Sequence, residues 1–355
     1  MIANSDPLGQ HDPAQAPMGT GPEPESLWTD WSRSFGLQVP ILNAPMGGVA
    51  GGVLAAAVSK AGGLGMVGVG SAGTVEFLRE QTSVPSLAGI RFGVGLLAWA
   101  VQNDPGLLDA AICAGPSLIS VSFGNEWWWV DRVHDAGIAT ATQVYDVDSA
   151  REAYEAGVDI LVARGSEGGG HGIHRVSTLV LLQGVMDAVP ATVLAAGGIA
   201  SARGLAAVLA AGASGVWLGT PFLACPESLA TDAVRALVLK ARGEDTVQTR
   251  IFDIALGYPW PPRFDERVLR NDVTDRWCHR EDELARDPQA RIAVAGFVEL
   301  GGPATAVVDA GQGVGLVTDV RPAAAVIGEM ASGAAALLAA WALRHQPGCS
   351  HRNGA

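Results

Sequence analysis

One glycine-rich segment of the sequence holds a histidine that could act in catalysis. The segment runs from Arg164 to Gly172 and reads RGSEGGGHG, with His171 near its end. An apolar β-type run precedes it, so we expect His171 at the carboxyl end of a strand, where it is neither a packed core residue nor a helix-face residue. Imidazole there can act as a base, an acid or a hydrogen-bond donor near neutral pH. Glu167 could orient the ring or the loop; the alternative is a solvated loop in which neither residue has a role.

Three other glycine-rich segments follow apolar runs and could bind a ligand through their backbone. In Asn43–Gly52 (NAPMGGVAGG), Pro45 fixes a turn and the glycines let a flat ligand approach the main chain. The segments 195–200 and 218–221 fall where (β/α)8 enzymes commonly hold phosphate through backbone N–H groups. Neither contains Lys or Arg, which is compatible with backbone donors and the hydroxyl of Thr220. The alternative is that these glycines form tight turns and helix starts without a ligand.

Other kinds of site receive less support from the sequence. The seven histidines show no metal-ligand spacing with carboxylates, so no metal site is predicted. The nucleophile pattern GxSxG is also missing. Trp127, Trp128 and Trp129 could line a substrate pocket, pack in the core or contact another subunit. The four cysteines form no CxxC pair, which is typical of reduced thiols in a cytoplasmic protein.

A repeated pattern of elements must position these loops. Helical stretches end in an Ala-Gly pair, and a short apolar run follows each pair, as expected for strands of a parallel sheet covered by helices. The glycines of these pairs are Gly62, Gly89, Gly115, Gly137, Gly157 and Gly212. The eight apolar runs are 41–44, 64–69, 90–97, 118–122, 138–144, 159–163, 192–196 and 215–218. Eight such units predict an α/β protein of the (β/α)8 TIM-barrel class, with its active site on the loops after the strands.

A doubly wound nucleotide-binding sheet is the alternative fold. Gly68–Gly73 fits GxGxxG between a strand and a helix. That motif also requires an acidic residue about 20 positions further on. The stretch 90–100 offers none, and the eight repeated units favour the barrel.

The regular pattern divides the chain into five parts. Residues 1–35 are predicted to be a disordered N-terminal extension, and 36–242 to form the barrel with its ligand site. Residues 243–310 are more charged, contain Pro259-Trp260-Pro261-Pro262, and are predicted to form a lid or subdomain inserted after strand eight. Residues 311–345 should pack back on the barrel through a helix, and 346–355 should be a frayed tail.

Composition narrows the set of partners. The chain has 355 residues, 46 of them glycine, with 23 Lys+Arg against 36 Asp+Glu and a net charge of −13. Nucleic-acid binding needs a clustered basic face, and the sequence shows none. No uncharged apolar run approaches the roughly 20 residues of a membrane span. We therefore expect a small-molecule substrate and neither a nucleic-acid nor a membrane partner; a homodimer is left open.

Taken together, four stretches resemble the nitronate monooxygenase family. They are Pro40–Gly68, Thr142–His171, Val193–Phe222 and the segment AGQGVG at 310–315. The resemblance implies an FMN flavoprotein on a (β/α)8 barrel that oxidises alkyl nitronates with O2 to a carbonyl compound and nitrite. His171 matches the family's catalytic histidine.

The resemblance also implies which residues bind the ligands. The cofactor-binding residues would be Ala44, Pro45, Met46, Gly47, Gln143, Gly169, Gly170, Gly197, Gly198, Gly219 and Thr220. Glu167, Trp127 and Gln312 are candidates for substrate binding. The chain departs from the family at Gly95, where many relatives have Asn, which removes one hydrogen bond to flavin or substrate. It also has GGG before His171 where AGG is more usual.

Two other functions stay open on the sequence. The chain is also similar to flavin-dependent enoyl-acyl-carrier-protein reductases, which would use NAD(P)H to reduce an enoyl thioester. Their carrier would need a basic entry patch, which Arg250, Arg263, Arg267 and Arg270 could provide. The last alternative is a non-catalytic flavin-binding protein, which the intact His171 loop disfavours.

Overall fold

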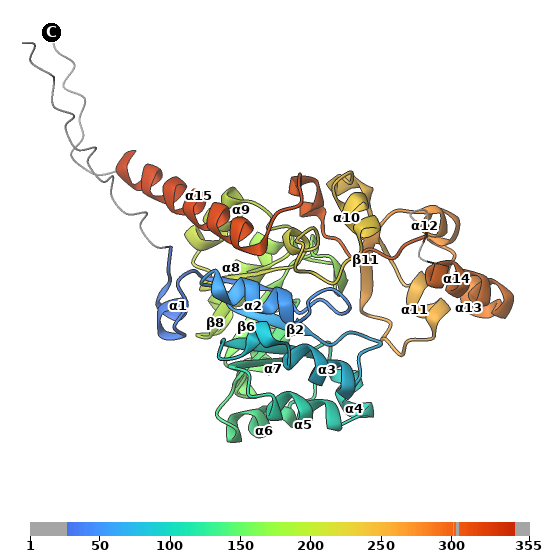
Figure 1. Ribbon diagram of the computed structural model, residues 1–355, viewed down its shortest axis with the longest axis horizontal. Helices are drawn as coiled ribbons and strands as arrows, with labels where there is room; N and C mark the ends of the chain where they lie inside the picture. Colours follow the sequence, from blue (N-terminus) through green and yellow to red (C-terminus); the bar gives the residue numbers. More distant parts are fainter. Residues whose placement is uncertain (1–26, 301, 303–304, 345–355) are drawn as a thin grey trace, which may run out of the picture.

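Eight parallel strands form the central sheet of the computed structural model, which describes residues 27–300, 302 and 305–344 (Figure 1). The strand order is β1-β9-β8-β6-β5-β4-β3-β2, and a parallel bridge between Leu42 and Leu64 joins β1 to β2. The sheet therefore closes into the predicted (β/α)8 barrel, and the doubly wound alternative is excluded. The strands are β1 (Ile41–Asn43), β2 (Gly65–Gly68), β3 (Phe92–Leu97), β4 (Leu118–Ser122), β5 (Ala139–Val144), β6 (Ile160–Arg164), β8 (Thr192–Ala196) and β9 (Gly215–Leu218).

Helices alternate with these strands and cover the outside of the barrel. All six glycines predicted to end helices have positive φ, between 65° and 101°, a conformation that glycine adopts without steric cost. The covering elements are α2 (Gly52–Lys60), α3 (Val75–Thr82), η1 (Pro85–Leu87), α4 (Ala98–Asn103), α5 (Gly106–Cys113), α6 (Trp129–Asp135), α7 (Val147–Glu155), α8 (Thr178–Ala188) and α9 (Ala202–Ala210). After β9 the chain forms η2 (Thr220–Phe222) and α10 (Asp232–Val238), which lead to the inserted segment.

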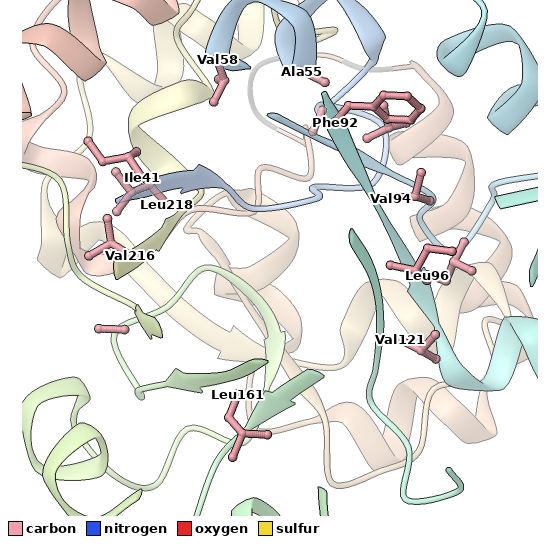
Figure 2. Close-up of a cluster of buried hydrophobic side chains, with 14 of the residues drawn as sticks. Ile41, Ala55, Val58, Phe92, Val94, Leu96, Val121, Leu161, Val216 and Leu218 are labelled. Carbon is pink, nitrogen blue, oxygen red and sulfur yellow. The ribbon is translucent and has the colours of Figure 1, made fainter. Parts of the chain in front are cut away.

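The hydrophobic core has two layers, because successive strand residues point to opposite faces of the sheet. Leu42, Met66 and Trp217 belong to the cluster inside the barrel. Their neighbours, such as Ile41 and Val216, belong to the larger cluster between strands and helices, part of which Figure 2 shows. Strands buried on both faces explain why the runs are apolar along their whole length.

A short helix, α1 (Asp30–Ser34), closes the amino-terminal end of the barrel. Residues 27–35 therefore differ from the predicted disordered extension. A capping box between Thr29 and Ser32 starts the helix, and the Thr29 hydroxyl donates to the carbonyl of Ser214, 2.6 Å away. Trp31 and Phe35 pack against the cluster inside the barrel, so their burial favours order. Residues 1–26, and the predicted frayed tail 346–355, lie outside the described residues.

The inserted segment after the barrel strands has its own sheet and core (Figure 1). β10 (Thr246–Thr249) pairs antiparallel with β11 (Asp265–Leu269), and β11 pairs antiparallel with β7 (Gly170–Gly172) of the barrel's sixth loop. Phe252, Trp277 and other apolar side chains form a separate buried cluster. The remaining elements of the segment are η3 (Gly243–Asp245), α11 (Ile251–Leu256), α12 (Asp272–Trp277), α13 (Glu281–Arg286) and α14 (Pro288–Leu300).

The chain returns to the barrel through η4 (Gln312–Leu316) and the long helix α15 (Ala323–Arg344), which packs mainly on α9 and also on α2 (Figure 1). Among the described residues, α15 alone is long and apolar enough, over 323–343, to cross a membrane by length and composition. About a third of that stretch, 33 %, is buried against the rest of the protein.

The start of β6 carries a carboxylate that ties it to β5. The Asp159 carboxylate accepts hydrogen bonds from the Thr140 amide and hydroxyl, both at 2.8 Å, and pairs with His134 at 2.9 Å. Burial alone would raise the pKa of Asp159, but these bonds lower it below its usual value. A carboxylate with a lowered folded-state pKa stabilises the protein above its unfolded-state pKa, and this stabilisation is lost as the pH falls through the folded-state value.

Asp159→Asn should therefore destabilise the protein by about 1–2 kcal/mol at neutral pH, as expected for lost hydrogen bonds to a charged acceptor. The difference from the parent protein should shrink once the pH falls below about 4, the ordinary value of an aspartate. Urea unfolding across this pH range measures both effects. Asp135→Asn, an exposed acid on α6, is the control and should change stability little. A difference that does not vary with pH would contradict the assignment.

Candidate active site

A cavity of about 520 Å³ opens at the carboxyl ends of the barrel strands. This volume lies in the usual range for sites that hold a cofactor or small molecule. The barrel supplies its wall through the loops after the strands, and the inserted segment supplies another part through Phe252, Leu256 and Trp260. The cavity therefore lies between two parts of the chain that are distant in sequence.

Most of the residues predicted to form the site line this one cavity. They come from four of the loops after the strands and from β5, and they lie together because those strand ends meet at one rim. The predicted residues in the lining are Ala44, Pro45, Met46, Gly47, Gln143, Gly169, Gly170, His171, Gly197, Gly198, Gly219 and Thr220.

Three predicted substrate-binding residues lie outside this lining. The Glu167 carboxylate accepts hydrogen bonds from the amide and hydroxyl of Thr178, at 2.9 and 2.8 Å, and so caps the start of α8. The backbone N–H of Gln312 donates to the backbone carbonyl of Glu167 at 2.9 Å. The ring of Trp127 packs near that of Trp129, with centroids 6.4 Å apart, against the outer core. Side-chain contacts thus give Glu167 and Trp127 structural roles, whereas Gln312 is held only through its main chain and its side chain is exposed.

The first loop is held against its neighbours by close backbone contacts. The buried side-chain amide of Asn43 bonds to both the N–H and the carbonyl of Met66, at 2.8 and 2.9 Å, and so joins β1 to β2. A Cβ on Gly47 would lie 2.3 Å from the Cα of Gly70. The first and second loops therefore touch through main chain, and the GxGxxG segment forms cavity wall.

Gly95, where the family resemblance leads us to expect Asn, has a packing reason to be glycine. It lies on β3 and lines the cavity beside Pro45. A Cβ on Gly95 would lie 2.2 Å from Cγ and 2.4 Å from Cβ of Pro45. The rigid proline ring cannot move away without displacing the first loop, so the two residues require each other.

His171 lies on β7, directly opposite Glu266 of β11. Its Nε2 is 2.9 and 3.1 Å from the two carboxylate oxygens of Asp253, which is 4 % exposed. Its ring stacks on Trp260, with centroids 3.6 Å apart and planes 4° from parallel. This contact occupies Nε2 and leaves Nδ1 without a hydrogen-bond partner among the described residues.

Two further acids surround His171. Burial raises the pKa of Glu266 well above its usual value, and the charges of Asp309 and Asp253 raise it further. One of its oxygens, Oε1, is buried without a hydrogen-bond partner among the described residues, which fits a neutral carboxyl group better than a charged one. Surrounding protein removes part of the water around Asp309 and thereby raises its pKa. The effect is limited, because the Asp309 side chain still contacts the solvent of the cavity.

The second loop histidine, His174, is placed differently. Burial, followed by the charge of Arg164, lowers the pKa of His174 to about 3, so it is neutral under ordinary conditions. Its ring nitrogens lie 3.1 and 3.2 Å from the carbonyls of Ser166 and Asp265. A neutral imidazole has one N–H and can donate to only one of them. His174 therefore helps to hold the loop rather than facing the cavity.

A buried arginine fixes the backbone of the histidine loop. Arg164 ends β6, is 5 % exposed, and donates through Nη2 to the carbonyls of Gly169 and Gly170 at 2.8 and 3.0 Å. A Cβ on Gly168 would lie 2.9 Å from its Cζ, which gives a physical reason for GGG rather than AGG here. Its Nη1 is buried without a partner among the described residues. The guanidinium thus places a positive charge in the cavity wall.

Sequence reasoning missed Asp253, Trp260, Glu266 and Asp309 as site residues. The only indication in the sequence was the predicted lid with its proline-flanked Trp260. It did not show which residues of the lid would contact His171. His171, Asp253 and Glu266 also bring one nitrogen and two carboxylates within 4.8 Å of one another, a grouping that could hold a metal ion. No sequence motif predicts this grouping, because Asp253 is 82 positions from His171 in sequence.

Comparison with known proteins gives a consistent picture. The family model described as nitronate monooxygenase matches residues 98–333. Nitronate monooxygenase npaC of Metarhizium robertsii is 32 % identical over 337 residues, covering 84 % of this chain and 91 % of the relative. The (3aS,4S,5R,7aS)-5-hydroxy-7a-methyl-1-oxo-octahydro-1H-indene-4-carboxyl-CoA dehydrogenase of Rhodococcus jostii is 33 % identical over 254 residues, covering 72 % of this chain and 69 % of the relative.

The fold has solved counterparts as well. The structure of FabK from Thermotoga maritima superposes with a TM-score of 0.77 at 29 % sequence identity. The match covers 90 % of this chain and 99 % of FabK. The similarity therefore includes the inserted segment as well as the barrel.

The contact between Gly95 and Pro45 makes a testable prediction. Gly95→Ala should force Pro45 and the first loop apart and lower the free energy of unfolding by about 1–3 kcal/mol, the usual cost of overpacking. Gly95→Asn should cost at least as much, even though it restores the family's side chain. Urea unfolding measures the change. Gly328→Ala is the control, because a Cβ there meets nothing within 4 Å and alanine favours the α15 helix. A stable Gly95→Asn protein would refute the packing explanation.

Proposed function

This chain belongs to the nitronate monooxygenase family, and we propose that it is an FMN-dependent enzyme that oxidises alkyl nitronates with O2 to a carbonyl compound and nitrite. One observation carries the proposal: His171 lines the cavity at the carboxyl ends of the strands, with its Nε2 bonded to the buried Asp253. A histidine held in this way can meet a small anion or a carbon acid with its free nitrogen.

The residues that line the cavity support FMN as its ligand. Backbone at Gly169, Gly170 and Gly47 would lie along the flat ring system, since no side chain there obstructs it. The phosphate would lie at the loops 197–200 and 219–221, beside the start of α9, where backbone N–H groups favour an anion. The unpartnered Nη1 of Arg164 fits a site that carries anionic ligands. FMN, when bound, supplies the electron transfer between the nitronate and dioxygen.

The chain's own residues would position the substrate and manage its charge. With its N–H on Nε2 donated to Asp253, a neutral His171 presents the lone pair of Nδ1 and can accept the proton of a nitroalkane carbon acid. When protonated, the same Nδ1–H donates a charge-assisted hydrogen bond to a nitronate oxygen. Asp253 stabilises the charged imidazole in both cases. Trp260 and Phe252 cover the site from the inserted segment and limit the entry of water.

An FMN-dependent NAD(P)H enoyl-thioester reductase is the second candidate, since one relative carries a CoA dehydrogenase name. Two of the four arginines expected to form a basic entry patch for a phosphate-bearing carrier are already engaged by other groups. Arg267 is buried and donates to the Ser166 carbonyl at 3.0 Å, and Arg270 pairs with Asp275 at 3.7 Å. The acids Asp253, Glu266 and Asp309 face the cavity instead. The engagement of Arg267 and Arg270 leaves fewer free cationic groups for the phosphates of a carrier, which favours a small substrate.

We expect the purified protein to be yellow and to release FMN on denaturation. Under anaerobic mixing, an alkyl nitronate should bleach the flavin absorbance within the turnover time, whereas NAD(P)H should reduce it only slowly. In air, nitrite should form with oxygen uptake. Rapid reduction by NAD(P)H without any response to nitronates would establish the reductase instead, and a colourless protein that cannot bind added FMN would defeat both candidates.

His171→Ala should lower turnover at least about 100-fold, the usual scale for loss of an acid–base group, and leave the flavin content near normal. Asp253→Asn should lower turnover by a smaller factor, about 10-fold or more, because the ring loses its charged partner. Steady-state nitrite release measures both. Asp282→Asn, an exposed acid on α13 of the same segment, is the control. Full activity in His171→Ala would remove this residue from the mechanism.

A further inference from the structure

The ring of Trp260 covers one whole face of the His171 ring. The centroids are 3.6 Å apart and the planes differ by 4°, so the two rings lie flat on each other. Trp260 is 6 % exposed and belongs to the proline-flanked run of the inserted segment. One face of His171 is therefore closed to substrate, which can reach this residue only at its edge or its other face.

The hydrogen bond to Asp253 cannot by itself fix the His171 ring. A bond from Nε2 holds one atom, at 2.9 Å from the carboxylate, and lets the ring turn about the axis of that bond. A flat partner on one face removes this freedom, because turning the ring would lose the stacked contact. Asp253 and Trp260 together define both the position and the plane of His171.

Trp260 is itself held by the barrel. Its Nε1 donates to the hydroxyl of Ser71 at 2.9 Å, across 189 positions of sequence. Ser71 lies in the glycine loop after β2, the GxGxxG segment of the cavity wall. The edge of Phe123 meets the Trp260 ring at 4.9 Å and 83°, and Phe264 packs against both.

The backbone of Phe123 has an unusual conformation, which is further evidence that the aromatic contacts around Trp260 are specific. Its φ is 71°, and among the described residues only His279 is another non-glycine with positive φ. A bulky residue in this region is strained and persists where its surroundings determine it. Phe123 directly follows β4, and in this conformation its ring contacts the rings of Trp260 and Phe264.

We propose that Trp260 is a positioning residue that sets the ring plane of His171, and that Ser71 sets the place of Trp260. The glycine loop after β2 thus acts on the reaction through the inserted segment, without touching His171 itself. The effect on turnover rests on the proposed function, because it requires that His171 takes part in the reaction; the effect on the geometry of His171 does not.

The first experiment reads that geometry without turnover. In the flavin-loaded protein, the His171 Cε1–H proton should resonate upfield through the ring current of Trp260, and the spectrum of His171→Ala assigns it. Trp260→Ala should move this signal downfield towards that of a free histidine. Trp260→Phe and Ser71→Ala fold with smaller changes and should move it part of the way. A signal that stays in place in all three variants overturns the proposal.

The second experiment is a double-mutant cycle on nitrite release. Trp260→Ala should lower kcat by about 100-fold, the scale of a misplaced catalytic group, with KM changed far less. Ser71→Ala and Trp260→Phe both delete the same hydrogen bond, so each should lower kcat, and the double variant should have the kcat of Trp260→Phe alone. Fully additive losses, or a kcat within twofold of the parent in every variant, would overturn the coupling.

Trp277→Phe is the matched control for these variants. Trp277 is buried in the core of the inserted segment and does not line the cavity, so its change should lower thermal stability and leave kcat and the His171 signal in place. If the signal moves with Trp260 but His171→Ala keeps full nitrite release, His171 has no part in the reaction and only its positioning stands. If the parent protein releases no nitrite from nitronates, the proposed function fails, and the shift of the His171 signal still tests the positioning.

Discussion

Three residues of a barrel loop, Gly170–Gly172, pair with the inserted segment as strand β7, and the rest of the site depends on this pairing. A loop this rich in glycine would lose much conformational entropy if it were ordered alone. The ladder to β11 and the guanidinium of Arg164 supply the bonds that order it. The same ladder brings Glu266 opposite His171, and the helix before it carries Asp253. The histidine thus lies on a barrel loop that forms a strand of the inserted segment's sheet, so both parts of the chain hold it.

The barrel and most of its rim could be predicted because their signals are local. A helix that ends needs a residue with positive φ, and glycine at positions such as Gly137 and Gly157 supplies it within the sequence itself. A strand buried on both faces is apolar throughout, so β4 and β6 are visible as runs. Parallel strand order then places loops such as Asn43–Gly52 and 195–200 on one rim, whatever the details of the packing.

The partners of His171 could not be predicted, because they depend on contacts between distant segments. Asp253 resembles any other acid of a charged stretch until the fold brings it 2.9 Å from Nε2. Gly95 shows the opposite difficulty: the sequence indicates a missing amide, whereas the structure shows a contact with the Pro45 ring. The order of helix α1 could not be predicted for a similar reason. Trp31 is buried only by contact with the cluster inside the folded barrel, which is distant in sequence.

Closure between β1 and β9 has a consequence for how the protein is made. Ile41 pairs with Val216, so β1, the first barrel strand to be synthesised, can pair with β9 only after the other barrel strands have been made. Until then its free edge is open to solvent, and the Asn43 side chain already ties it to β2 through both polar groups of Met66. The partner strand of β7 is translated later still. Domains form from the amino terminus during synthesis, so the barrel can close before its histidine has a neighbour. The nascent chain therefore acquires its architecture first and its reactive centre last.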